Sequence, residues 1–136
     1  MDRVGGMFDI ELCEPRRIVL VRFRGQVTEA DFTNLDRLAA EQRGKAVAFD
    51  CIYDMTGIEN FDLETSFVAR RGDLPQPYAD HERIYAVANA DLKLLLRLYA
   101  AYQVSRGWKA PVIVASLAEA LDRLGVGPGD FTKLSR

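Results

Sequence analysis

Two aspartates on one predicted strand are candidates for acid/base catalysis. Asp50 and Asp54 are four residues apart, so they share one face of an extended segment and could form an acid/base pair. At about 3.3 Å per residue, however, their carboxylates would lie ~13 Å apart, too far to serve one reacting centre. Asp54 alone is better placed, because open α/β sheets bind ligands beyond the carboxyl ends of their strands. We favour its alternative role, in which it accepts amide hydrogen bonds in a local turn.

The other reactive side chains do not combine into a known type of active site. His81 is the single histidine and lies in the polar segment Asp80-His81-Glu82, which is typical of a surface residue. Cys13 and Cys51 have neither metal-ligand spacing nor a CxxC relation, so we expect small buried hydrophobes. No nucleophile motif or phosphate-binding glycine loop is present. The sequence therefore predicts no catalytic residue, no metal site and no cofactor, and it disfavours an enzyme.

Composition and charge exclude further classes of protein. The chain has 136 residues, about one domain in length, with 49% hydrophobic and 28% charged residues. A formal net charge of -2 argues against a nucleic-acid-binding protein. The longest apolar-rich run, Leu92 to Tyr102, is interrupted by Lys93 and Arg97 and is too short to span a membrane. We predict a soluble cytoplasmic protein.

Predicted strands and helices alternate along the chain. Strands are predicted over residues 8–12, 18–23, 46–53, 83–88 and 111–115, and helices from Thr28 to Gln42 and over residues 63–71, 92–106 and 117–124. This order predicts a single α/β domain with a five-stranded mixed sheet and about four helices. Strands two to five would be mostly parallel, with the N-terminal strand antiparallel at the edge. The domain would span residues 8–125, between a flexible N-terminus (1–7) and a C-terminal tail (126–136).

The longest predicted helix carries more apolar surface than one packing face requires. One stripe contains Leu92, Leu95, Leu96 and Tyr99, and a second, rotated stripe contains Leu94, Leu98, Ala101 and Tyr102. Either the tail covers the second stripe through Phe131 and Leu134, or this helix forms a self-association surface or a ligand pocket. The candidate residues for a ligand or dimer surface are Phe67, Leu94, Leu95, Leu98, Tyr99 and Tyr102.

The segment between the third predicted strand and the next helix resembles a known family signature. It reads Asp54-Met55-Thr56-Gly57-Ile58-Glu59-Asn60-Phe61-Asp62. STAS domains, the fold of bacterial anti-sigma factor antagonists, carry a pattern like Asp-Leu-Ser-Gly-Val-x-Phe-Ile-Asp-Ser-Ser-Gly after their third strand. Asp54, Thr56, Gly57, Ile58 and Asp62 fall on matching positions. The whole chain is most similar to the divergent STAS-like or CRAL-TRIO-like branch. In a loop of this kind we expect Gly57 at a positive-φ turn position.

This resemblance implies a regulatory domain that acts by protein contact. The partner-binding loop would include Asp54, Thr56, Gly57, Asp62, Leu63 and Glu64. In the family a partner kinase phosphorylates a serine soon after the second aspartate, but Leu63 and Glu64 occupy those positions here. Thr65 and Ser66 are the remaining candidates for phosphorylation, and on a helix they would face a different direction. By resemblance alone, the partner would be an anti-sigma-factor-like kinase.

Two functions from different classes remain open. The first is a non-catalytic interaction domain without the usual phosphoserine, and the alternative is a module that binds a small apolar ligand or lipid between the sheet and the longest helix. A cavity near or above ~300 Å³ would favour the ligand, and a closed core at Leu95 and Tyr99 would favour protein contact. A homodimer through the longest helix is compatible with either function.

Overall fold

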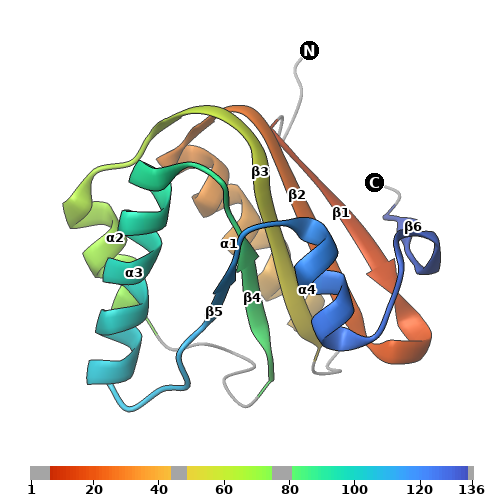
Figure 1. The fold of residues 1–136 in the computed structure, drawn as a ribbon. Helices are drawn as coiled ribbons and strands as arrows, with labels where there is room; N and C mark the ends of the chain where they lie inside the picture. Colours follow the sequence, from red (N-terminus) through yellow and green to blue (C-terminus); the bar gives the residue numbers. More distant parts are fainter. Residues whose placement is uncertain (1–6, 44–48, 75–80, 135–136) are drawn as a thin grey trace.

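The computed structural model describes residues 7–43, 49–74 and 81–134, which form an α/β domain (Figure 1). Its sheet has six strands: β1 (Phe8–Cys13), β2 (Ile18–Thr28), β3 (Asp50–Asp62), β4 (Arg83–Ala86), β5 (Val112–Val114) and β6 (Thr132–Lys133). The helices are α1 (Glu29–Arg43), α2 (Thr65–Gly72), α3 (Ala90–Ser105) and α4 (Leu117–Leu124), with short 3-10 turns η1 (Glu14–Arg16) and η2 (Pro128–Asp130). The predicted α/β class and the number of helices are confirmed within these residues.

The sheet is mixed, in the order β5-β4-β3-β2-β1-β6. Strands β2 to β5 are parallel to one another, as predicted, and β1 is antiparallel to β2. The prediction of five strands with β1 at the edge is wrong, because β6 pairs antiparallel with β1 and sets Lys133 opposite Glu11. This sixth strand comes from the predicted tail. It has only two residues, too few for an alternating pattern to reveal it.

The longest strand contains the segment predicted as a loop. β3 continues through Asp62, which pairs with Thr28 at the end of an equally extended β2. Two register shifts occur along this pairing, so β3 contains bulges that bend it without ending it (Figure 1). The next helix accordingly begins at Thr65 rather than at residue 63. Residues 46–48 of the predicted third strand lie outside the described residues.

Gly57 has a different role from the one predicted. It is not among the positive-φ glycines, so the prediction of a left-handed turn position is wrong. A Cβ atom at Gly57 would instead lie 2.7 Å from the carbonyl oxygen of Phe23 on β2. Glycine is therefore required here because two neighbouring strands approach closely at a bulge.

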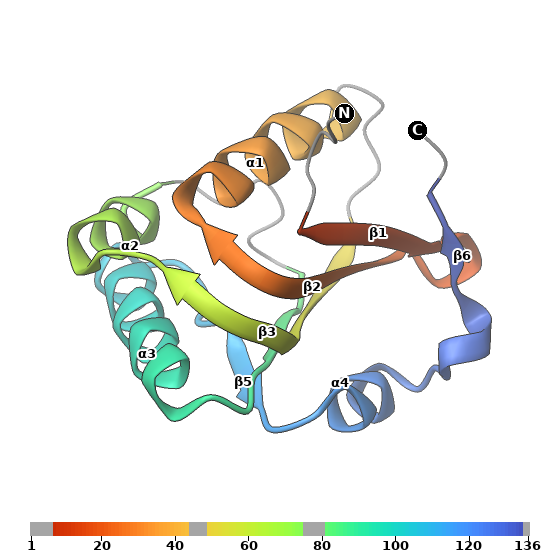
Figure 2. The same ribbon diagram turned by 90° about the horizontal axis from the view of Figure 1, so that it is seen from above.

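Helices cover both faces of the sheet. Seen from above, α1, α2 and α3 lie on one face and α4 lies on the other (Figure 2). Alternation along the strands divides the apolar residues between these faces. Val21, Phe23 and Tyr85 join the core under α1–α3, whereas Leu20 and Ile84 join the core under α4.

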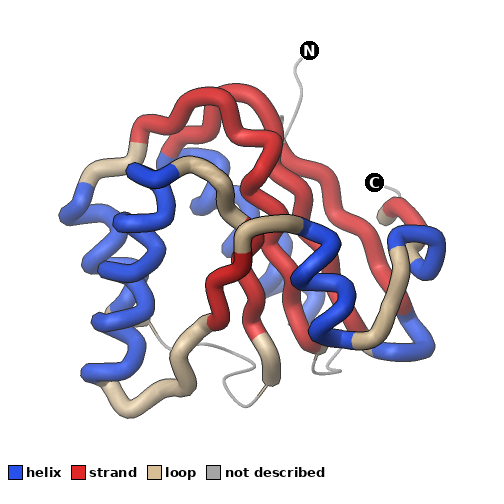
Figure 3. The backbone as a smooth tube through the Cα atoms, in the orientation of Figure 1, coloured by secondary structure: helices blue, strands red, loops and turns tan. Residues whose placement is uncertain are grey.

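The C-terminal segment does not cover the outer stripe of α3. Figure 3 shows β6 beside β1, and α3 on the far side of the molecule. Phe131 packs against the core under α4, and the amide of Leu134 donates to the carbonyl of Ile10 at 2.8 Å. The first explanation for the doubly apolar helix is therefore wrong. None of the described helices combines the length and apolarity that a membrane span needs.

Candidate binding site

Asp54 is a buried residue with local partners. One carboxylate oxygen accepts hydrogen bonds from the Thr56 amide at 3.1 Å and from the Thr56 hydroxyl at 2.6 Å. The other oxygen lies 3.5 Å from Nε of Arg22 on β2. Asp54 pairs with Ala86, the last residue of β4, so it does lie at the carboxyl edge of that part of the sheet. Its contacts hold the first bulge of β3, which is the structural role favoured from the sequence.

Beyond Asp54 the predicted partner-binding residues form an exposed strand edge. Because β4 ends at Ala86, the rest of β3 is paired with β2 alone within the described residues. The exposed residues of this segment and of the helix start that follows it are Thr56, Gly57, Glu59, Asn60, Asp62, Glu64, Thr65 and Ser66. Glu64 is the N-cap residue of α2, and its amide donates to Glu29 of α1 at 3.4 Å. Leu63 differs from these residues because its side chain is half-buried and lines a pocket.

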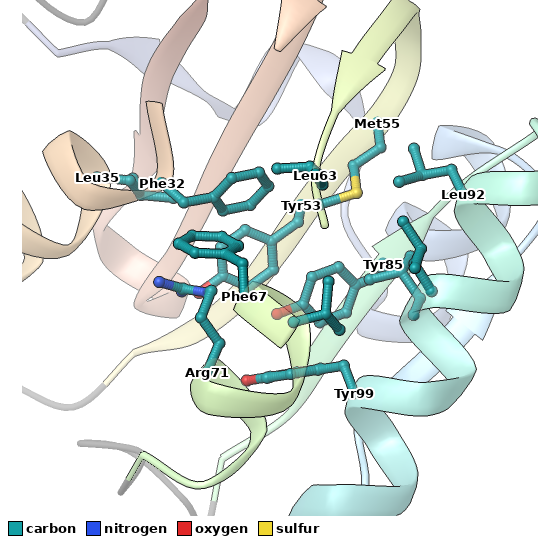
Figure 4. Close-up of a pocket in the computed structure, with 13 residues that line it drawn as sticks. Phe32, Leu35, Tyr53, Met55, Leu63, Phe67, Arg71, Tyr85, Leu92 and Tyr99 are labelled. Atoms are coloured by element: carbon teal, nitrogen blue, oxygen red, sulfur yellow. The ribbon is translucent and has the colours of Figure 1, made fainter. Parts of the chain in front are cut away.

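That pocket lies between the sheet and the layer of α1, α2 and α3 (Figure 4). Its volume is about 50 Å³. Its walls are Phe32, Leu35, Tyr53, Met55, Leu63, Phe67, Val68, Arg71, Tyr85, Leu92, Leu95, Leu96 and Tyr99. Of the candidates for a ligand or dimer surface, Phe67, Leu95 and Tyr99 line it. Leu94 and Tyr102 do not line it and are exposed, and Leu98 packs at the margin of the core.

Aromatic rings make up much of the pocket wall. Tyr53 and Tyr85 come from neighbouring positions on β3 and β4, and their rings stack with centroids 4.6 Å apart. Tyr99 of α3 meets Tyr85 edge-on at 6.1 Å. The guanidinium of Arg71 lies over the rings of Phe32 and Phe67, at 5.3 and 5.9 Å from their centroids. These contacts give the pocket flat apolar walls with a cation at one side.

Two arginines lie at or next to the pocket. Arg71 donates to both carboxylate oxygens of Asp36 on α1, through Nη1 at 2.5 Å and Nη2 at 3.0 Å. Burial acts to lower the pKa of Arg71, but the hydrogen bond and charge of Asp36 outweigh it and raise that pKa above its ordinary value. The guanidinium of Arg71 therefore stays positively charged.

The second arginine, Arg83, is buried and bonds to neutral acceptors. Its Nη1 donates to Gln103 at 3.0 Å and to the Tyr99 hydroxyl at 3.3 Å, and its Nη2 donates to the carbonyl of Lys109. Among the described residues, no carboxylate forms an ion pair with Arg83. A positive charge is therefore held next to the tyrosines without a neutralising partner there.

The buried phenols and the nearby thiol keep their protons. Burial is the main cause that raises the pKa of Tyr53 and of Tyr85 well above the ordinary value. Burial likewise raises the pKa of Cys51 to about 11. The Tyr85 side chain is 7% exposed, and a side-chain hydrogen bond with Tyr99 is among the causes that raise the pKa of its hydroxyl.

Sequence reasoning missed the polar part of this pocket. One signal was available: Ile52-Tyr53 and Ile84-Tyr85 repeat the same pair on two strands predicted to be parallel. Paired in register, they place both tyrosines on one face and both isoleucines on the other. No comparable signal distinguishes Arg71 from the exposed Arg70 beside it.

The remaining predicted residues lie away from the pocket. His81 is partly exposed, and its Nδ1 lies 3.2 Å from Asp50 at the opposite end of β3 from Asp62. Asp50 also accepts from the amide of Glu82 at 2.9 Å, so it links the starts of β3 and β4. Within the described ranges, no group of His, Cys, Asp and Glu has a geometry suited to a metal ion.

No protein-family model matches the chain, and no similar protein was found among curated sequences.

Proposed function

We propose that this chain is a non-catalytic, cytoplasmic interaction domain of STAS-like type that binds a protein partner through the β3 edge. By the β3 edge we mean residues 56–66, from the first bulge of β3 to the first turn of α2. The observation that carries the proposal is the exposure of this segment along a strand that, among the residues the structure describes, has a partner on one side only. Unpaired backbone groups and accessible side chains at such an edge can bind another chain.

The charge of the β3 edge favours a specific partner over self-assembly. Glu59, Asp62 and Glu64 are exposed there, and the segment contains no lysine, arginine or histidine. Together with the two bulges, this charge opposes the pairing of two identical edges, because like charges would face each other. A partner with basic side chains would gain from the same arrangement.

The size of the pocket favours protein contact over lipid transport. Its volume of about 50 Å³ is well below the ~300 Å³ at which small-molecule sites usually begin. A lipid chain would require α2 or α3 to move away from the sheet. STAS-like membership is supported by the element order and by Asp54, Thr56, Gly57, Ile58 and Asp62, although this segment is a bulged strand here.

A phosphoserine switch is not part of the proposal. Glu64 already places a negative charge at the N-cap position of α2, next to Thr65 and Ser66. Both hydroxyls are exposed and accessible to a kinase. A phosphate on either one would add to a charge that is already present, so its effect on binding would be smaller than at a neutral position.

Site-specific photo-crosslinking in the native cell tests this function. A benzophenone amino acid is placed at Glu59 or Thr65 on the β3 edge, and at Ala118 on the exposed side of α4 as the matched control. We expect one discrete partner adduct from the first two positions and none from Ala118. Reversing the charge with Glu59→Lys should weaken the adduct formed from Thr65. The same adducts from all three positions, or adducts from none, would rule out this partner surface.

A further inference from the structure

We propose that the outer side of α2 and α3 docks on an anionic lipid bilayer. By the outer helix face we mean the side of these two helices that is not packed against the sheet, with Arg70, Lys93, Leu94, Arg97, Tyr102 and Val104. This surface is separate from the β3 edge, and the inference does not depend on the protein partner proposed there.

The first argument is the place where exposed apolar side chains gather. Among the residues that the structure describes, the large hydrophobic side chains that are exposed are Leu74, Leu94, Tyr102 and Val104. Three of them belong to α3, and the carbonyl of Leu74, which follows α2, accepts from Gln103 of α3 at 3.4 Å. Figures 1 and 2 show α2 and α3 side by side at the periphery of the molecule. Exposed apolar groups that share one part of a surface, with charged groups around them, mark a contact with a protein or a membrane.

The second argument is the charge on the same face. Arg70 and Arg97 are exposed and Lys93 is half-buried, and within the described ranges none of the three forms an ion pair with a carboxylate. The only carboxylate of α3 is Asp91, in its first turn. Three cations and one carboxylate leave a positive surplus here, although the whole chain has a net charge of -2. The lipid headgroups that such a surface attracts are anionic ones.

The third argument is the shape of the face, which favours a bilayer over a second copy or another folded protein. The outer stripe of α3 is ~24 Å long and ~10 Å wide, about 240 Å², well below the ~800 Å² that each partner buries in a stable protein interface. It is the convex side of a helix, and cations interrupt its apolar side chains. A bilayer requires no complementary groove, because leucine and valine can enter the headgroup boundary while arginine and lysine remain at headgroup level.

The acidic β3 edge gives the docked domain a definite orientation. Glu59, Asp62 and Glu64 are exposed at the end of α2 where that helix begins. Anionic headgroups repel these carboxylates and attract the cations farther along the two helices. The β3 edge would therefore be held away from the lipid, where a protein partner can reach it.

Sedimentation of the full chain with lipid vesicles tests this inference. One set of vesicles contains phosphatidylcholine and phosphatidylglycerol in equal parts, and the other contains phosphatidylcholine alone. We expect the protein to sediment with the anionic vesicles at low ionic strength, to be released by high salt, and to bind the neutral vesicles more than about ten-fold more weakly.

Three variants identify the surface that binds. Arg97→Gln should weaken binding to the anionic vesicles about five-fold, the usual contribution of one cation near a charged membrane. Leu94→Ser should weaken it about ten-fold, because the side chain, now 62% exposed, no longer enters the headgroup boundary. Arg123→Gln is the matched control, since it removes the same charge from a half-exposed side chain of α4 on the opposite face of the sheet, and it should bind like the wild type.

The inference is overturned if the protein does not sediment with anionic vesicles, or binds neutral vesicles equally well. It is also overturned if Leu94→Ser binds like the wild type, or if Arg97→Gln and Arg123→Gln have the same affinity. A benzophenone amino acid at the exposed Ala101 in the native cell separates a bilayer from a protein partner. We expect a lipid adduct there, and a discrete protein adduct, or no lipid adduct, would overturn the inference. The adducts formed from Glu59 and Thr65 test the β3 edge separately, so either proposal can fail without the other.

Discussion

Replacing Gly57 tests whether the chain around this residue, within the segment from Asp54 to Asp62, is a bulged strand or a turn. In Gly57→Ala the new Cβ would lie 2.7 Å from the carbonyl oxygen of Phe23, whereas ordinary contacts begin at 3.4 Å. The β2 and β3 backbones must therefore separate by about 0.7 Å at a point where both are held by ladder hydrogen bonds. Overpacking of this kind costs about 2–3 kcal/mol. Alanine restricts the unfolded chain more than glycine and offsets about 0.5–1 kcal/mol of that cost.

A net loss of about 1–2.5 kcal/mol should lower the melting temperature by roughly 3–15 °C in a domain of this size. Urea unfolding and calorimetry measure the loss, with Gly129→Ala as the control because a Cβ there meets no atom within 4 Å. Gly57→Asn distinguishes the two backbone conformations. Asparagine is tolerated better than alanine at a positive-φ turn, but at a close strand contact it gains nothing over alanine. If Gly57→Asn melted well above Gly57→Ala, or Gly57→Ala melted with the wild type, the strand interpretation would be refuted.

Three further predictions follow from the helical layer and from the charged groups at the starts of β3 and β4. Light scattering should report a monomer, because the outer stripe of α3 is too small for a stable interface. The helix is ~24 Å long and offers a stripe of roughly 240 Å², whereas each partner in a stable interface buries ~800 Å². Leu94→Glu should leave that mass unchanged, and a wild-type dimer would contradict the estimate. Arg83→Met should destabilise the domain by about 2–4 kcal/mol in urea unfolding, because it leaves the buried oxygen of Gln103 without its donor. An unchanged free energy of unfolding would mean that water replaces the arginine. The hydrogen bond and charge of Lys109 lower the pKa of Glu82. The stability that the Glu82 carboxylate contributes is therefore present above its unfolded-state pKa and is lost as the pH falls through its folded-state pKa. In Glu82→Gln the free energy of unfolding should fall less at acid pH than in the wild type. Identical profiles of unfolding free energy against pH for the two proteins would exclude the contribution of Glu82.

Hydrophobic periodicity predicted the elements that pack in regular layers. The parallel arrangement of β2 to β5 and the extents of α3 and α4 agree with it, because each has enough residues for its period to be recognised. The length of β3 was missed because Gly57 and Asn60 are typical turn residues. Only the extended β2 beside them, with its two register shifts, keeps them in the sheet. Whether such residues turn or bulge depends on the neighbouring strand, which the local sequence does not contain.

The sequence predicted only part of the candidate pocket, and the reason is similar. Phe67, Leu95 and Tyr99 followed from helical spacing and from the apolar excess of α3. Tyr85 and Arg71 depend on which strands are neighbours and which side of α2 faces α1, and both are decided by tertiary packing. Tyr85 contributes a polar group to the pocket wall, yet in the sequence it stands within the short apolar run Ile84-Tyr85-Ala86-Val87.

The pairing of β6 with β1 has a practical consequence for anyone shortening this chain. Phe8, Ile10 and Leu12 alternate along β1, and the short β6 ladder and the Leu134 amide occupy part of its outer edge. A chain stopped at Gly125 would lose that cover and would also remove Phe131 from the core under α4. An apolar strand edge of this kind readily aggregates. Recombinant versions of the domain should therefore extend at least to residue 134 to remain well behaved at the concentrations that NMR requires.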